Sequence, residues 1–368
     1  FMMPSNAYKD TRETNNRGHS VYIREATPDD NEELQRLQAL CPQGTSLIVS
    51  TVNSPDFFAR VKAYESYKVY AACEGERIIA SHACALRNAL VGGRLHRVGY
   101  SFQTFVDPNH RKENLAKHLL QHMEDHLIQN DAVLVYGLIM EKNVPSIKLV
   151  ESLGFQLERR LAMPGLTVRK EMDIRCGGKI RTADSEDLES VAGLLNDTWK
   201  NHELYDPVSA ESLAQFISRT PGLAMENLLV LEKRGELVSC LGFWDWSRVM
   251  RLTLEAISPK FKVLGRLLFA TRVLPRILKP GDQLNQILLI LIGYKEPSLL
   301  AALIRHVNNI ALERDIRQIF CICEKHHAML KGLKGFVRIT TNMDLYMKPL
   351  QGPVMLHDHP VFVDGIDL

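Results

Sequence analysis

The chain lacks the features that mark secreted, membrane-spanning or nucleic-acid-binding proteins. No run of eighteen apolar residues occurs, so the sequence predicts no membrane span, and its start lacks the charged-then-apolar pattern of a signal peptide. The net charge is only +2, which gives no electrostatic case for a nucleic-acid partner. The seven cysteines form no Cys-x-x-Cys pair, so we expect free thiols, a cytoplasmic location and no metal site.

What remains is the composition of an ordinary globular protein. The chain has 368 residues, of which 45% are apolar and 24% charged, and this length is comfortable for two domains. Residues 1–20 are polar and unpatterned, so we expect a tail there. We expect a second tail at residues 351–368.

The stretch 98–155 carries the clearest pattern of alternating elements. Its residue types and spacing predict, in order, a strand at 98–106, a helix from Asn114, a buried strand at 132–139 and a short helix from Asn143 to Gly154. Between the first strand and the first helix lie three cationic residues, His110, Arg111 and Lys112. The free N–H groups and the dipole at a helix N-terminus favour a phosphate, so we expect a phosphate-bearing cofactor here.

Two motifs in this stretch give it a family resemblance. Residues 111–116 match the signature [Q/R]-x-x-G-x-[G/A] at Arg111 and Ala116, with Asn114 where glycine is usual. A second signature is matched by Asn143, Ser146, Leu149, Glu151, Gly154 and Phe155, whereas Val150 replaces a tyrosine that often serves as general acid. With both motifs in this order, residues 21–161 resemble the GNAT family of acyl-CoA-dependent N-acetyltransferases.

The resemblance implies a fold class, a co-substrate and a set of binding residues. The fold would be α/β with a mixed sheet, and the co-substrate would be acetyl-CoA. The strand backbone at Phe105 and Val106 would hold the pantetheine arm and polarise the thioester. The remaining cofactor residues implied by the resemblance are Arg111, Lys112, Glu113, Asn114, Leu115, Ala116, Asn143 and Ser146. Asparagine tolerates a positive φ better than other non-glycine residues, so the loop can form with Asn114.

The proton acceptor is left open by the sequence. Tyr100 stands where some relatives carry a catalytic carboxylate, and Glu141, at the end of the next strand, could act through a water. By default we interpret each of them as a core or a surface residue. His82 is a further candidate, with a structural histidine the favoured interpretation. His357 and His359 have metal-like spacing but no further ligands, so we interpret them as part of a polar tail.

An internal repeat predicts two domains. The sequence IREATPDD at 23–30 returns as IRTADSED at 180–187, which indicates tandem GNAT-like acyl-CoA N-acyltransferase domains at 21–170 and 177–350. The second half predicts the same elements: a hairpin around 234–235, a strand at 284–292, a helix at 298–314, a strand at 318–323 and a helix at 326–332. Its loop at 293–297 lacks the arginine and the spaced small residues, so we expect no second cofactor site.

Two variable stretches, 42–67 and 249–281, carry no readable specificity code. Residues 259–281 are basic and apolar at helical spacing. We favour a packed cover helix there, and the alternatives are a cleft wall or a surface for an acidic partner or membrane.

The predicted function is transfer of an acetyl group to a primary amine of a small molecule or peptide. The alternative is a non-catalytic acyl-CoA-binding or regulatory protein, which the residues at 114 and 150 would favour. The acceptor and the oligomeric state are left open.

Overall fold

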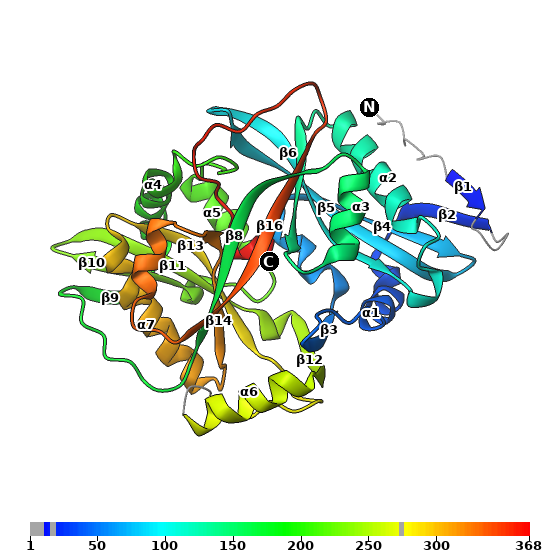
Figure 1. Cartoon of the computed structure of the whole chain (residues 1–368). Coiled ribbons are helices and arrows are strands. Elements are labelled where there is room, and N and C mark those ends of the chain that lie inside the picture. The colour runs from blue at the N-terminus through cyan, green and yellow to red at the C-terminus, as the bar shows by residue number, and fades with distance from the viewer. Residues whose placement is uncertain (1–10, 15–19, 272–275) are drawn as a thin grey trace.

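The structure is a computed structural model that describes residues 11–14, 20–271 and 276–368. Among these residues fourteen strands form one mixed sheet, and helices cover it (Figure 1). No helix of the described ranges has the length and apolar character needed to cross a membrane. The expectation of a tail at 1–20 is wrong for residues 11–14, which form a strand paired with residues 20–23, and residues 1–10 and 15–19 lie outside the described residues.

The N-terminal half forms one side of this sheet. Its strands are β1 (Thr11–Thr14), β2 (Ser20–Glu25), β4 (Ser66–Glu74), β5 (Arg77–Val91), β6 (Arg94–Val106) and β7 (Leu134–Met140). They lie in the order β1-β2-β4-β5-β6-β7, and only the β6–β7 pair among them is parallel. The helices of this half are α1 (Asn31–Ala39), α2 (Leu115–Gln129) and α3 (Val144–Ser152). The strands and helices predicted for 98–155 are therefore confirmed.

The C-terminal half repeats this arrangement. Its strands are β9 (Lys179–Thr182), β10 (Leu228–Lys233), β11 (Glu236–Asp245), β13 (Gln286–Tyr294), β14 (Gln318–Phe320) and β15 (Cys323–Glu324). Its helices are α4 (Leu188–Trp199), α5 (Ala210–Arg219), α6 (Pro259–Ala270) and α7 (Pro297–Glu313). The predicted strand at 318–323 is interrupted between β14 and β15. The helix predicted at 326–332 is the 3₁₀ helix η8 (Ala328–Leu333).

The repeated sequence makes the same contact in both halves. Arg24 donates two hydrogen bonds to Asp30, each 2.6 Å long. Arg181 donates two to Asp187, at 2.5 and 2.8 Å. In both halves this bidentate pair joins a strand, β2 or β9, to the turn before the next helix, and it lowers the pKa of the aspartate. The repeat is therefore one of structure as well as of sequence.

The two halves exchange their last strands. The strand β8 (Gln156–Thr167) follows the N-terminal half in sequence but pairs with β14 of the C-terminal half. The strand β16 (Arg338–Pro349) belongs to the C-terminal half but pairs with β7. These two strands also pair with each other, so they lie side by side at the centre of Figure 1. A division at 170–177 therefore describes the sequence order and not two separate sheets.

The two variable stretches also join the halves. The strand β3 (Leu47–Asn53) pairs with β12 (Met250–Ile257) in an antiparallel ribbon apart from the main sheet. The sequence predicted no strand in either stretch. Their pairing fixes them relative to each other, because each supplies the hydrogen-bond partners of the other.

Residues 351–368 correct the expectation of a second tail. Val361, Val363 and Ile366 are buried, and a short 3₁₀ helix, η9 (Gly365–Asp367), lies near the middle of the molecule (Figure 1). Segment 361–368 is therefore part of the core. The remaining 3₁₀ helices are η1 (Pro28–Asp30), η2 (Phe57–Ala59), η3 (Val61–Ala63), η4 (Pro108–His110), η5 (Ser185–Asp187), η6 (Met225–Asn227) and η7 (Trp246–Arg248).

Candidate functional site

The strands β6 and β7 separate at their carboxyl ends. Their parallel pairing runs only from Val98 opposite Leu134 to Ser101 opposite Gly137, although β7 continues to Met140 and pairs along its whole length with β16 on its other edge. Just after this point β6 carries a bulge, because its register with β5 shifts and Gln103 has a φ of 52°. The backbone from Gln103 to Val106 is thereby turned away from β7.

The side chain of Gln103 lies at this bulge. Its amide nitrogen and oxygen are both buried, and neither has a hydrogen-bond partner among the described residues. An unpaired buried amide costs free energy, so this position is suited to a polar ligand group.

The loop between β6 and α2 follows directly. Asn114 has a φ of 59° and is the N-cap of α2, so the prediction that asparagine can adopt this conformation is confirmed. Arg111 and Lys112 are exposed, whereas Leu115 is buried and anchors the helix start in the core. Cationic side chains therefore lie beside the first N–H groups of α2, which have no acceptor within the helix.

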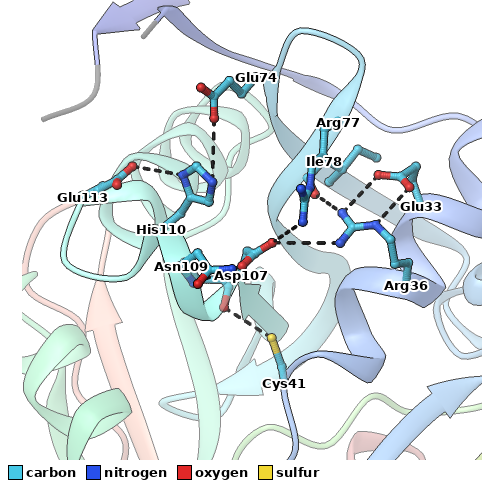
Figure 2. Close-up of polar contacts among 11 residues, drawn as sticks. Glu33, Arg36, Cys41, Glu74, Arg77, Ile78, Asp107, Asn109, His110 and Glu113 are labelled. Carbon is cyan, nitrogen blue, oxygen red and sulfur yellow. Dashed lines mark hydrogen bonds and ion pairs between the residues drawn. The ribbon is translucent and has the colours of Figure 1, made fainter. Parts of the chain in front are cut away.

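A buried carboxylate holds the start of this loop (Figure 2). The Asp107 side chain is fully buried and accepts hydrogen bonds from the Asn109 N–H and from Arg77 Nη2, each 3.0 Å long. Arg36 of α1 adds a second cation, with its Nη1 3.9 Å from the carboxylate. Strand β5 and helix α1 therefore fix the place where the loop leaves β6.

A histidine and two glutamates hold the rest of the loop. His110 lies between Glu113, 3.2 Å from its Nδ1, and Glu74, 3.7 Å from its Nε2 (Figure 2). Glu113 belongs to the predicted cofactor residues, but its side chain is buried against His110. Its carboxylate is thus engaged inside the loop.

The strand end also contacts a cysteine that the sequence did not single out. The thiol of Cys41 donates a hydrogen bond to the Val106 carbonyl over 3.3 Å. Burial raises the pKa of this thiol, so it is neutral and can donate. Cys41 follows α1 directly and so ties that helix to the carboxyl end of β6.

The predicted residues on α3 have a local contact. Asn143 caps the helix, and its side chain accepts a hydrogen bond from the Ser146 N–H over 3.4 Å. This is the capping interaction expected for asparagine at a helix start.

Neither predicted proton acceptor is well suited to that role. Tyr100 is buried, its hydroxyl donates a hydrogen bond to the Asp367 carbonyl, and burial raises its pKa further above neutrality. Glu141 is exposed and accepts a hydrogen bond from Asn342 over 2.8 Å, which lowers its pKa. Tyr100 is held as a neutral core residue, and Glu141 is ionised but weakly basic.

The candidate histidines of the sequence, His82, His357 and His359, contact other side chains of the fold. His82 is fully buried, its pKa falls to about 3 through burial, and its Nδ1 lies 2.9 Å from the Thr104 hydroxyl. The rings of His357 and His359 lie 5.8 Å apart. Among the described residues no group of three or more potential ligands could hold a metal ion.

Segment 361–368 brings carboxylates to the centre of the molecule instead. Asp367 is buried and accepts a hydrogen bond from the Tyr64 hydroxyl over 2.8 Å, and its carboxylate lies 3.5 Å from Arg87. Burial and the nearby Asp367 raise the pKa of Asp364 to about 7. Sequence spacing gave no signal for this cluster, because Tyr64 and Asp367 lie at opposite ends of the chain.

The C-terminal half repeats the bulge but not the loop. The register of β11 with β13 shifts, and Leu291 has a φ of 48°. Here the chain itself covers the bulge, because the Leu291 N–H donates to Asp364 over 3.3 Å. Only Lys295 and Glu296 separate β13 from α7, whereas residues 107–114 separate β6 from α2.

The N-terminal half thus combines a sheet that opens at a bulge with a cationic loop and a helix N-terminus. Residues 32–155 match the acetyltransferase (GNAT) family, so this part of the chain is a GNAT acetyltransferase domain. No match was found among curated proteins.

Solved structures of acyltransferases resemble the whole chain. The N-myristoyltransferase of Saccharomyces cerevisiae with bound myristoyl-CoA and inhibitors has a TM-score of 0.65 at 11% identity, over 89% of this chain and 80% of that one. A GCN5-related N-acetyltransferase of Sphaerobacter thermophilus has a TM-score of 0.54 at 15% identity, over 91% and 98% of the two chains. At these identities the likeness establishes the fold, and it covers both halves.

Proposed function

We propose that this protein transfers an acetyl group from acetyl-CoA to a primary amine of a small molecule or peptide, with the cofactor bound in the N-terminal half. The separation of β6 from β7, directly before the loop at 107–114, carries this proposal. It exposes strand backbone that can pair with the amides of a pantetheine arm. The loop lies at the end of the same strand, where the pyrophosphate of that cofactor would follow.

The cofactor residues have distinct roles in this proposal. The backbone at Phe105 and Val106 holds the pantetheine arm and polarises the thioester carbonyl as charge develops on its oxygen. The N–H groups of residues 111–116 bind the pyrophosphate, and Arg111 adds a cation. Gln103, whose buried side-chain amide has no hydrogen-bond partner among the described residues, supports a ligand at this strand. Asn143 and Ser146 hold the start of α3 beside it.

The chemistry needs a group that takes the proton of the amine. A base works best when its pKa lies near the operating pH, and that of Asp364 is about 7. Asp367, three residues away, is bonded through its carbonyl to Tyr100 of β6. Asp364 is therefore a further candidate for the proton acceptor, beside Tyr100 and Glu141.

The protein binds one CoA in this proposal. The C-terminal half has the bulge at Leu291, but the N–H of Leu291 already donates a hydrogen bond to Asp364. In addition, only two residues connect β13 to α7. Such a connection is too short to surround a pyrophosphate.

The second candidate function is acyl-CoA binding without catalysis. It is favoured by Val150 in place of the usual tyrosine and by the unsuitable surroundings of Tyr100 and Glu141. Both functions share the cofactor site and differ in the release of free CoA when an amine is present.

Calorimetry with CoA and acetyl-CoA, followed by a transfer assay on a panel of amines, tests the proposal. We expect one equivalent of CoA per chain and amine-dependent release of the free thiol. Binding without release supports the second function. No binding at millimolar ligand would exclude both, and two equivalents would contradict the single site.

A further inference from the structure

Helix α6 lies open on the molecule. None of its residues is buried, although six are large and apolar. Their exposed fractions include 67% for Val263, 60% for Leu267, 44% for Phe269, 43% for Leu264 and 41% for Phe261. The favoured prediction of a packed cover helix at 259–281 is therefore wrong for the helix itself. Contiguous apolar side chains of this size on a surface mark an interaction site.

Apolar and cationic side chains both lie on the exposed surface of α6. Val263 and Leu267 are four residues apart and share one face, which continues through Leu264 and Leu268. Lys262 and Arg266 are also four residues apart and flank this face, and Lys260 lies within it, three residues before Val263. Figure 1 shows α6 at the lower edge of the molecule, beyond β12 and away from the main sheet. We call the exposed residues of this helix, Lys260–Leu264, Arg266, Leu267 and Phe269, the α6 surface.

The charge of this region indicates what covers it. Residues 259–281 contain six lysines and arginines and no aspartate or glutamate, although the whole chain carries only +2. A second copy of the helix would bring like charges together, which is unfavourable. A bilayer with anionic lipids offers an apolar layer beneath negative headgroups, and basic amphipathic helices lie in that interface.

We propose that the α6 surface binds the protein to an anionic lipid bilayer. The helix lies parallel to the membrane, with Val263, Leu264 and Leu267 inserted among the lipids. Lys262 and Arg266 reach the headgroups along the sides of the helix, as long cationic side chains do at such interfaces. A single short helix gives reversible attachment, so the protein exchanges between membrane and solution.

Co-sedimentation of the full chain with vesicles tests this proposal. Two vesicle types are compared, pure phosphatidylcholine and phosphatidylcholine mixed with phosphatidylglycerol. We expect binding only to the second type, and weaker binding as salt is added. Lys262→Gln with Arg266→Gln removes two cations and should weaken partitioning roughly 30-fold. Val263→Ser with Leu267→Ser removes the inserted side chains and should weaken it by at least about tenfold.

Matched controls come from surfaces elsewhere on the molecule. Leu95 is 55% exposed, and the side chain of Lys200 is 61% exposed. Leu95→Ser and Lys200→Gln should leave vesicle binding unchanged, and circular dichroism melting checks that every variant is folded. Equal binding by the folded α6 variants and the unchanged protein would overturn the proposal.

Sedimentation velocity without vesicles separates self-association from lipid binding. A monomer, unaffected by the α6 substitutions, is the expected result. A dimer that the same substitutions dissociate, together with no vesicle binding, would mean that a second copy covers the helix and would refute the bilayer.

Discussion

The backbone N–H of Leu291 donates a hydrogen bond to the carboxylate of Asp364 over 3.3 Å. Leu291 is the bulged residue of β13 and corresponds to Gln103 of β6 in the other half. Segment 361–368 of the chain thus covers the bulge at Leu291. At the other bulge, the buried side-chain amide of Gln103 has no hydrogen-bond partner among the described residues. The two halves keep the same backbone deformation but use it differently.

Gly365 should be essential for this packing. A Cβ added there would lie 2.3 Å from the Leu289 carbonyl oxygen, which is closer than any real contact. We expect Gly365→Ala to lower the free energy of unfolding by about 1–3 kcal/mol, because segment 361–368 or β13 must shift. Denaturant unfolding measures this. Gly193→Ala is the control, since its Cβ would meet nothing within 4 Å. Equal stability of the two variants would contradict the close approach.

Arg111 should contribute to CoA affinity through its charge. Loss of a hydrogen bond to a charged group weakens binding roughly ten- to hundredfold, which we expect for Arg111→Gln by calorimetry. Arg94→Gln, at the opposite end of β6, is the matched control and should bind normally. An unchanged affinity for Arg111→Gln would make Arg111 an ordinary surface residue.

Asn114 should behave as a tolerated replacement for glycine. Its φ of 59° is strained for a residue with a side chain, so Asn114→Gly should raise stability slightly and leave CoA affinity equal or better. Asp131→Gly is a suitable control, because Asp131 has a φ of 61° at the end of α2, away from the loop. A tenfold loss of affinity for Asn114→Gly alone would instead show that its amide binds the cofactor.

Tyr100 should act in folding and not in proton transfer. Tyr100→Phe removes one buried hydrogen bond to the Asp367 carbonyl, so we expect a loss of about 1 kcal/mol in unfolding free energy. The pH profile of the transfer reaction should keep its shape. A profile that loses its alkaline or acidic limb in this variant would restore Tyr100 as a participant in catalysis.

Asp364 should make stability depend on pH. Its pKa in the folded protein, about 7, lies above the ordinary value of 3.8, so folding favours the protonated form. The stabilising effect of this protonation is complete below pH 3.8 and is lost as pH rises through 7. Asp364→Asn should therefore be less sensitive to pH between these values and more stable than the parent above pH 7.

Urea titrations at several pH values measure this difference. Asp197→Asn, whose side chain is 75% exposed, is the control and should follow the parent curve. The same variants address the proton acceptor: if Asp364 takes the proton of the amine, Asp364→Asn should lose the rise in transfer rate around pH 7. An unchanged rate profile would remove Asp364 from the reaction.

The sequence by itself determined the local elements and the cofactor loop. The order strand, turn and helix at 98–128 follows from β-branched residues, Asp107-Pro108 and apolar residues at helical spacing, which act over a few positions. The repeat predicted the second copy of the fold. The structure confirms it, because the pairs Arg24–Asp30 and Arg181–Asp187 make the same contact in the two halves. The degenerate loop at 293–297 was also readable, because arginine and small residues are simply missing there.

Only the tertiary structure decided how the halves are joined and which carboxylates lie at the centre. The strand β16 pairs with β7 and β8. The residues of β16 do not predict these partner strands, because every strand offers the same backbone hydrogen-bonding groups. Asp367 contacts Tyr64 and Tyr100, which lie far from it in the sequence, so no rule based on residue spacing could predict these contacts. Residues 351–368 were predicted as a tail, and only the structure shows that Val361, Val363 and Ile366 are buried.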